Sequence, residues 1–74
     1  MTIEEIKIYS SGTTGRVEIK EYRTIYFKFN WAGIITKLYF QPAGENDIDI
    51  TPIVNPKLKK QIQSEFLKAC NALN

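Results

Sequence analysis

The feature that most constrains this chain is a central run in which large apolar side chains occupy every second position. These side chains are Ile25, Phe27, Phe29 and Trp31. The residues between them are Thr24, Tyr26, Lys28 and Asn30. A period of two places successive side chains on opposite faces of a β-strand, and β-branched and aromatic residues suit such a half-buried surface. We therefore expect a strand whose larger apolar face, Trp31 included, lies in the core.

The alternation extends toward the N-terminus, where Val17 and Ile19 lie between charged residues. No glycine, proline or asparagine stands between Lys20 and Thr24 to mark a turn. Two interpretations remain open: one long strand over residues 16–31 with a β-bulge near Glu21, or a tight turn at Tyr22–Arg23. We favour the long strand, because a bulge explains both the break in alternation and a bend in the strand.

On the C-terminal side, Ala32-Gly33 separates the central run from a second alternating run over residues 34–41. A short connection that contains glycine between two such runs predicts a β-hairpin. The period then divides the second run into two faces. We expect the core face to carry Ile34, Thr36, Leu38 and Phe40. We expect the other face to carry Ile35, Lys37, Tyr39 and Gln41.

The N-terminal residues 3–9 read as a further strand, since Ile6 and Ile8 alternate with Lys7 and Tyr9. The spacing of Ile3 and Ile6 leaves a short helix, capped by Thr2, as the alternative. The loop Ser10–Gly15 contains the string Gly-Thr-Thr-Gly, which occurs in phosphate-binding and nucleic-acid-binding loops. Those loops lead into a helix, whereas alternation follows here, so a plain hairpin loop is the better interpretation.

A second turn follows at Gln41–Asp47, where proline and glycine end the strand. Ile48 and Ile50 then alternate with polar residues, which predicts a short last strand over residues 47–51. Glu45, Asp47 and Asp49 do not have the ligand number and spacing of a calcium loop. We interpret them as solvated charges that protect an edge strand from pairing with other chains.

The C-terminal segment predicts a helix over residues 56–73, with Asn55 as N-cap and Pro56 at the first helical position. Its apolar residues recur at helical spacing and form one stripe. The stripe consists of Leu58, Ile62, Phe66, Ala69, Cys70 and Leu73. We expect its first three members to pack on the face that carries Ile25, Phe27, Phe29 and Trp31.

Together these elements predict an α+β fold. An antiparallel sheet of four to five strands is covered on one face by a single C-terminal amphipathic helix, giving two layers. With 74 residues, the chain is expected to form a single domain over residues 1–74. One helix covers one sheet face, so the second face is left to solvent or to another molecule.

Composition excludes several classes of function. One cysteine and no histidine exclude an internal disulfide and a Cys/His zinc site. No nucleophile stands near a suitable base, so we expect neither catalysis nor a cofactor or metal. No apolar run approaches the roughly 20 residues that span a bilayer, and no signal segment opens the chain. We therefore expect a cytoplasmic protein without membrane contact.

The uncovered sheet face is the expected binding surface. Its candidate residues are Lys20, Tyr22, Tyr26, Lys28, Lys37 and Tyr39. With Arg16 included, this surface is expected to carry four basic residues and one acidic residue, Glu18. Tyrosines and cations on a sheet suit single-stranded nucleic acid, while exposed tyrosines equally suit a protein interface or a homodimer. We favour a non-catalytic protein-interaction module (homodimer, adaptor or inhibitor), with single-stranded nucleic-acid binding as the alternative.

Overall fold

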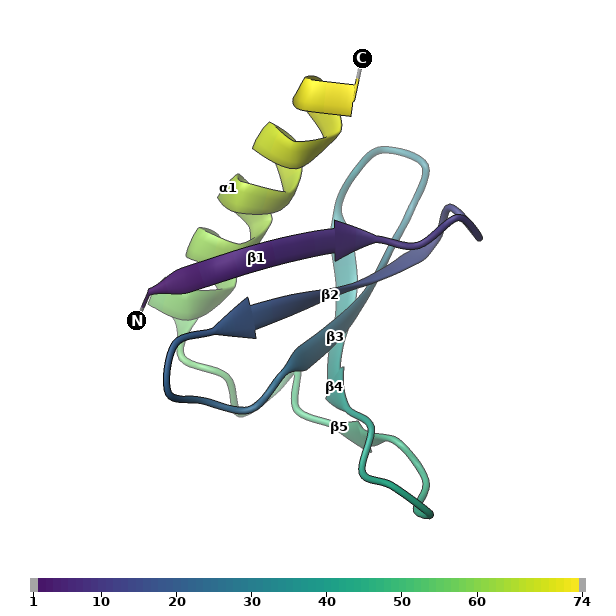
Figure 1. The fold of residues 1–74 in the computed structure, drawn as a ribbon, viewed down its shortest axis with the longest axis vertical. Coiled ribbons are helices and arrows are strands. Elements are labelled where there is room, and N and C mark those ends of the chain that lie inside the picture. The colour runs from purple at the N-terminus through teal and green to yellow at the C-terminus, as the bar shows by residue number, and fades with distance from the viewer. Residues whose placement is uncertain (1, 74) are drawn as a thin grey trace.

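The computed structural model describes residues 2–73, with side chains described as far as Asn71. Its elements are β1 (Ile3–Ile8), β2 (Thr14–Ile19), β3 (Ile25–Phe29), β4 (Ile35–Phe40), β5 (Ile48–Asp49) and α1 (Pro56–Leu73). The strands form one antiparallel sheet in the order of the chain, and α1 packs across one side of it (Figure 1). This arrangement confirms the predicted two-layer α+β fold. It also confirms the strand interpretation of the N-terminal residues.

The core lies between α1 and the inner face of the sheet. Its buried members are Val17, Ile19, Ile25, Phe27, Leu38, Ile50, Ile62 and Phe66. Phe66 of α1 contacts Phe27 edge-on, with ring centroids 5.3 Å apart, and also contacts Phe29 at 4.6 Å. The predicted apolar stripe of α1 therefore faces the predicted strand. Leu73, the last predicted member of the stripe, lies outside the described side chains.

Gly15 shows how closely this core is packed. It was expected in the loop, but it lies inside β2, opposite Phe27 and Ile8 on the two neighbouring strands. A Cβ on Gly15 would lie 2.6 Å from Cζ of Phe27 and would overlap the carbonyl oxygen of Lys7. The glycine therefore makes room for the Phe27 ring, and the hairpin loop is shorter than the sequence suggested.

The predicted long strand over residues 16–31 is wrong, because β2 and β3 are separate strands joined by a tight turn. Glu21 occupies that turn with a φ of 60°, and the amide of Tyr22 donates to the carbonyl of Ile19 at 3.1 Å. A left-handed residue reverses the chain, whereas a bulge only bends it. Glutamate is not a residue type that favours this conformation, so the sequence carries no signal for the turn.

Two further predictions about faces are wrong for a related reason. β3 ends at Phe29, so Trp31 lies in the following turn and is 99% exposed. Pairing between β3 and β4 shifts by one residue after Lys28, so Phe29 pairs with Ile35 instead of Thr36. A one-residue shift exchanges the faces of a strand, so Ile35 packs on the core and Ile34 is exposed.

The last strand is shorter than predicted, with two residues instead of residues 47–51. Beyond Asp49, the side chain of Thr51 takes the place of strand pairing. Its hydroxyl accepts the amide of Leu38 at 2.9 Å and lies 2.6 Å from Oδ1 of Asp49, to which it donates. The edge of β4 is thus satisfied by a side chain, which explains why pairing between strands ends there.

Removal of the Thr51 hydroxyl should destabilise the protein. Thr51→Val keeps the side-chain shape but leaves the Leu38 amide without its acceptor, which costs about 1–3 kcal/mol in the free energy of unfolding. Urea denaturation measures this loss. Thr36→Val is the matched control, because its hydroxyl is exposed and makes one long contact of 3.4 Å with the Lys28 carbonyl. Equal effects of the two variants would contradict the assigned role.

Asp49 should make stability depend on acid pH. Hydrogen bonds from the hydroxyl and the amide of Thr51 lower the pKa of Asp49 below its ordinary value of 3.8. Its contribution to stability is therefore present above that value and is lost as pH falls through the lower, folded-state pKa. Asp49→Asn should lose less stability on acidification than the unmodified chain, measured by urea denaturation at neutral and acid pH. Asp47→Asn is the control and should leave the acid-dependent loss in place.

Candidate functional site

The outer face of the sheet, opposite α1, carries a row of side chains that crosses all five strands. The pairing register places Lys7, Arg16, Tyr26, Tyr39 and Asp49 opposite one another in that order. In the next row, Lys28 stands directly opposite Lys37. The structure thus brings four of the six predicted site residues together on this face, namely Tyr26, Lys28, Lys37 and Tyr39.

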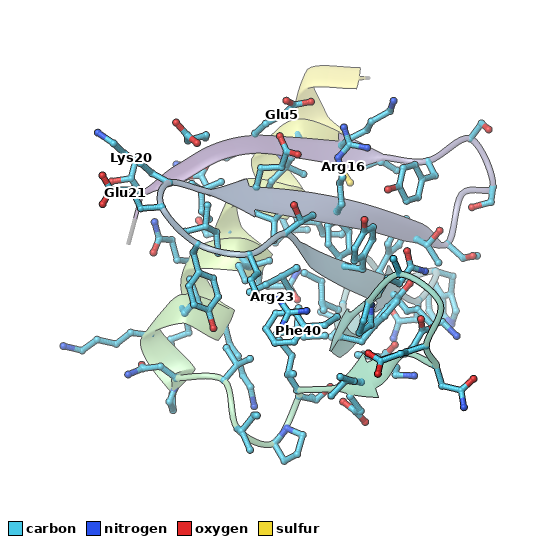
Figure 2. The ribbon with its side chains drawn as sticks, turned by 60° about the horizontal axis from the view of Figure 1, so that its bottom comes forward. Glu5, Arg16, Lys20, Glu21, Arg23 and Phe40 are labelled. Atoms are coloured by element: carbon cyan, nitrogen blue, oxygen red, sulfur yellow. The ribbon has the colours of Figure 1, made fainter. Side chains whose placement is uncertain are left out.

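The other two predicted residues, Lys20 and Tyr22, do not join this face. Both lie in the turn between β2 and β3, because the strand that was expected to carry them is interrupted there. Figure 2 shows Lys20 extending from that turn, away from Arg16 and from Glu5 on the sheet. Tyr22 contacts Phe40, whose ring packs toward the core, with ring centroids 6.5 Å apart.

The tyrosines on the outer face are packed against each other. Tyr39 is 4% exposed and stacks on Tyr26, with centroids 5.9 Å apart and the planes inclined by 28°. Lys37 places its Nζ 5.1 Å from the Tyr39 ring centre. Burial is the main cause that raises the pKa of Tyr39, and the negative charge of the nearby Asp47 raises it further. The Tyr39 ring was predicted to be open to a ligand, but its neighbours cover it.

The charges of the outer face are more balanced than the sequence suggested. Its acidic side chains include Glu5 opposite Glu18 and Asp49 opposite Tyr39. The Nε atom of Arg16 lies 3.7 Å from Oε1 of Glu18. The pKa of Arg16 is raised, and the largest cause is a hydrogen bond with the side chain of Tyr9. The predicted excess of four basic residues over one is therefore reduced, because β1 and β5 add carboxylates to this face.

An apolar groove of about 380 Å³ lies where the start of α1 meets the sheet. Its apolar lining consists of Tyr22, Ile25, Phe40, Ile50, Ile53, Val54 and Leu58. Ile53 is 77% exposed, and the Arg23 guanidinium lies 4.2 Å from the centre of the Phe40 ring beside the groove (Figure 2). The groove therefore leaves apolar side chains before and at the start of α1 open to solvent.

A second exposed apolar surface lies at the tip of the β3–β4 hairpin, and we call it the Trp31 tip. It consists of Trp31, Ile34 and Leu67, all of which are exposed. Leu67 belongs to α1, and its Cδ2 lies 3.4 Å from the position that a Cβ on Gly33 would take. The hairpin loop runs beside the C-terminal half of α1, so Leu67 lies next to Gly33 of the loop (Figure 1).

The turn that carries Trp31 is held by hydrogen bonds. The side-chain oxygen Oδ1 of Asn30 accepts hydrogen bonds from the backbone amides of Ala32 and Ile34, each at 3.0 Å. The backbone amide of Asn30 donates to the Ile34 carbonyl at 3.0 Å. Gly33 has a φ of 78°, a conformation that favours glycine. The exposed indole therefore projects from a turn of defined shape.

Gln63 attaches this turn to α1. Its side-chain amide donates to the Gly33 carbonyl at 2.8 Å and accepts the Ile35 amide at 2.9 Å. The side chain thus takes two backbone groups that a neighbouring strand would otherwise pair. Gln63 lies outside the predicted apolar stripe of α1, and nothing in the helical spacing of the sequence marks this role.

The described residues offer little for metal chemistry. Within residues 2–73, no three side chains of histidine, cysteine, aspartate or glutamate gather closely enough to hold a metal ion. In the same part of the chain, no helix is long and apolar enough to cross a membrane.

Replacement of Gln63 should loosen the hairpin. Gln63→Met keeps the length of the side chain but removes both hydrogen bonds, so hydrogen exchange of the Ile35 amide should accelerate by about tenfold or more. The exchange is measured by NMR on labelled protein. Ser64→Ala, a change at the neighbouring exposed position, is the control. Unchanged protection of Ile35 in Gln63→Met would show that another acceptor holds the hairpin.

Comparison of the chain with protein-family models, with curated proteins and with solved structures finds no match in any of the three. The function must therefore be inferred from the chemistry of the surfaces themselves.

Proposed function

We propose that this chain is a small, non-catalytic protein-binding module that contacts its partner through the Trp31 tip. The observation that carries this proposal is the position of the single tryptophan, which is 99% exposed at the end of a hydrogen-bonded hairpin. Tryptophan is among the residues most enriched at the energetic centres of protein interfaces. Ile34 on the same hairpin and Leu67 on the adjoining helix add further exposed apolar surface.

The energetic reason is the apolar area of the indole. A tryptophan buries about 150–250 Å² when it is covered, which corresponds to roughly 4–6 kcal/mol at about 25 cal/mol per Å². In the free protein this stabilisation is not used. A partner that supplies an apolar pocket for the indole gains it, reduced by the entropic cost of association.

The order of the turn strengthens the case. Asn30 and Gln63 hold the backbone on both sides of Trp31, so little conformational freedom of the loop is lost when a partner binds. Lys59 and Lys60 lie on α1 beside Leu67. The partner that suits this surface has an apolar pocket with an acidic or polar rim.

The alternative function is single-stranded nucleic-acid binding at the outer face. The pair Lys28 and Lys37 favours it, because two directly opposed cations would gain from a phosphate between them. Base stacking is less well served, since Tyr39 is covered by Tyr26 and Lys37. The observations therefore favour the protein-binding function.

The test is affinity capture with the immobilised chain, using nuclease-treated lysate of the organism that encodes it. The unmodified chain should retain a specific protein that Trp31→Ala does not retain. The substitution should raise the dissociation constant of the complex by about 30-fold or more, as expected for a residue at the energetic centre of an interface. The unfolding free energy should change by less than about 0.5 kcal/mol, because the indole is exposed. The single tryptophan also reports the contact directly, through the shift of its fluorescence when purified partner is added.

Lys28→Ala is the matched control and should retain the same protein. The proposal fails if every retained protein binds Trp31→Ala as well as the unmodified chain. Direct binding of mixed single-stranded DNA or RNA that weakens with salt and with Lys28→Ala, but not with Trp31→Ala, would favour the alternative function instead.

A further inference from the structure

The two edges of the sheet are treated differently. At the β4–β5 edge, Thr51 and Gln63 occupy backbone groups of β4 with their side chains, and β5 itself has two residues. At the other edge, β1 is a six-residue strand, and no strand of residues 2–73 pairs with its outer side. The register of β1 is irregular between Ile3 and Glu5, but from Glu5 to Ile8 it is regular, and this stretch presents unpaired backbone groups to another chain.

The outward-facing backbone groups of β1 follow from its register with β2. The Tyr9 amide donates to the Thr14 carbonyl at 2.9 Å, and hydrogen-bonded pairs alternate along an antiparallel ladder. Lys7 and Glu5 therefore direct their backbone groups to β2. Ile6 and Ile8 occupy the alternate positions, so their backbone N–H and C=O groups point outward to the free edge.

The charges on β1 are poorly matched within the sheet. Glu5 stands directly opposite Glu18, and Lys7 stands directly opposite Arg16. Like charges in directly opposed positions are destabilising, although the diagonal neighbours offset part of this cost. Figure 2 shows Glu5 and Arg16 on the same side of the first two strands. Glu5 and Lys7 would each be better paired by a strand of opposite charge pattern on the free edge.

We propose that a second copy of this chain supplies that strand, with the two β1 strands antiparallel about a two-fold axis at Ile6. In this register, Glu5 of each copy faces Lys7 of the other, so two ion pairs form. The outward backbone groups of the two Ile6 residues bond reciprocally. The joined sheet has ten strands and a continuous apolar side.

Charge and face together select this register. Centring the pair on Lys7 would oppose two lysines, and centring it on Glu5 would oppose two glutamates. Any register centred between two residues would place the apolar side of one strand against the wet side of the other. Among the registers close to the middle of β1, the one centred on Ile6 satisfies both conditions.

The flank of β1 also suits a second copy. Ile3, Ile6 and Ile8 pack on the core but are only partly buried, and α1 lies alongside them. Ala69, Glu65 and Lys68 of α1 line the same seam as Ile3 and Ile6. A second copy at the edge would cover these isoleucines and bring the two seams together, adding apolar contact to the backbone hydrogen bonds.

Sedimentation equilibrium of the full chain, from micromolar to millimolar concentration, tests the proposal. We expect the average mass to rise from monomer to dimer. Glu5→Lys or Lys7→Glu alone would oppose like charges twice across the axis, so each should raise the dissociation constant by about tenfold or more. Each substitution also replaces a like-charge pair within the sheet by an attractive one, so neither should unfold the monomer.

Two further samples test the pairing itself. An equimolar mixture of Glu5→Lys and Lys7→Glu should form a heterodimer, and the chain that carries both substitutions should self-associate again. The proposal is overturned if the unmodified chain stays monomeric at every concentration, if both single variants dimerise as it does, or if the mixture fails to associate. None of these outcomes depends on Trp31, so they are independent of the proposed partner binding.

Discussion

The contact on which the rest of this fold depends is the meeting of Phe27 and Phe66. One helix must cover the inner face of a five-stranded sheet, and these two rings, both fully buried, join the central strand to the middle of α1. Gly15 leaves the space that the Phe27 ring occupies. A side chain at Gly15 or a smaller one at Phe66 would disturb the same contact, because interiors are packed without spare volume.

A small core leaves little stability to spend on unpaired polar groups, and the edge of β4 shows how the chain deals with this. Thr51 and Gln63 come from outside the sheet and bond backbone groups of Leu38 and Ile35. Gln63 lies on α1 and therefore also joins the two layers of the fold, whereas Thr51 follows β5 at the edge of the sheet. They stabilise the protein and at the same time close one edge to association, which directs any strand pairing to β1.

The proposed functions share one physical basis, which is surface that the monomer leaves poorly satisfied. At the Trp31 tip, that surface is apolar area held on an ordered turn. At β1, it consists of outward backbone groups and of Glu5 and Lys7 beside like charges. The outer sheet face, which the sequence made the first candidate, is better satisfied, because Tyr26, Tyr39 and Lys37 cover one another.

Local pattern in the sequence determined the elements that depend on neighbours along the chain. The period of two predicted the strand at Phe27 and the spacing of α1 predicted the stripe around Phe66, and both follow from the fixed geometry of strands and helices. Tertiary structure alone decided where strands end and which face each residue takes. The turn at Glu21 carries no glycine or proline, and the shift after Lys28 depends on pairing with another strand. The end of β3 at Phe29 moved Trp31 from the expected core to solvent, and packing of Tyr26 and Lys37 covered Tyr39. Strand ends and register depend on how strands meet, and no single strand encodes them.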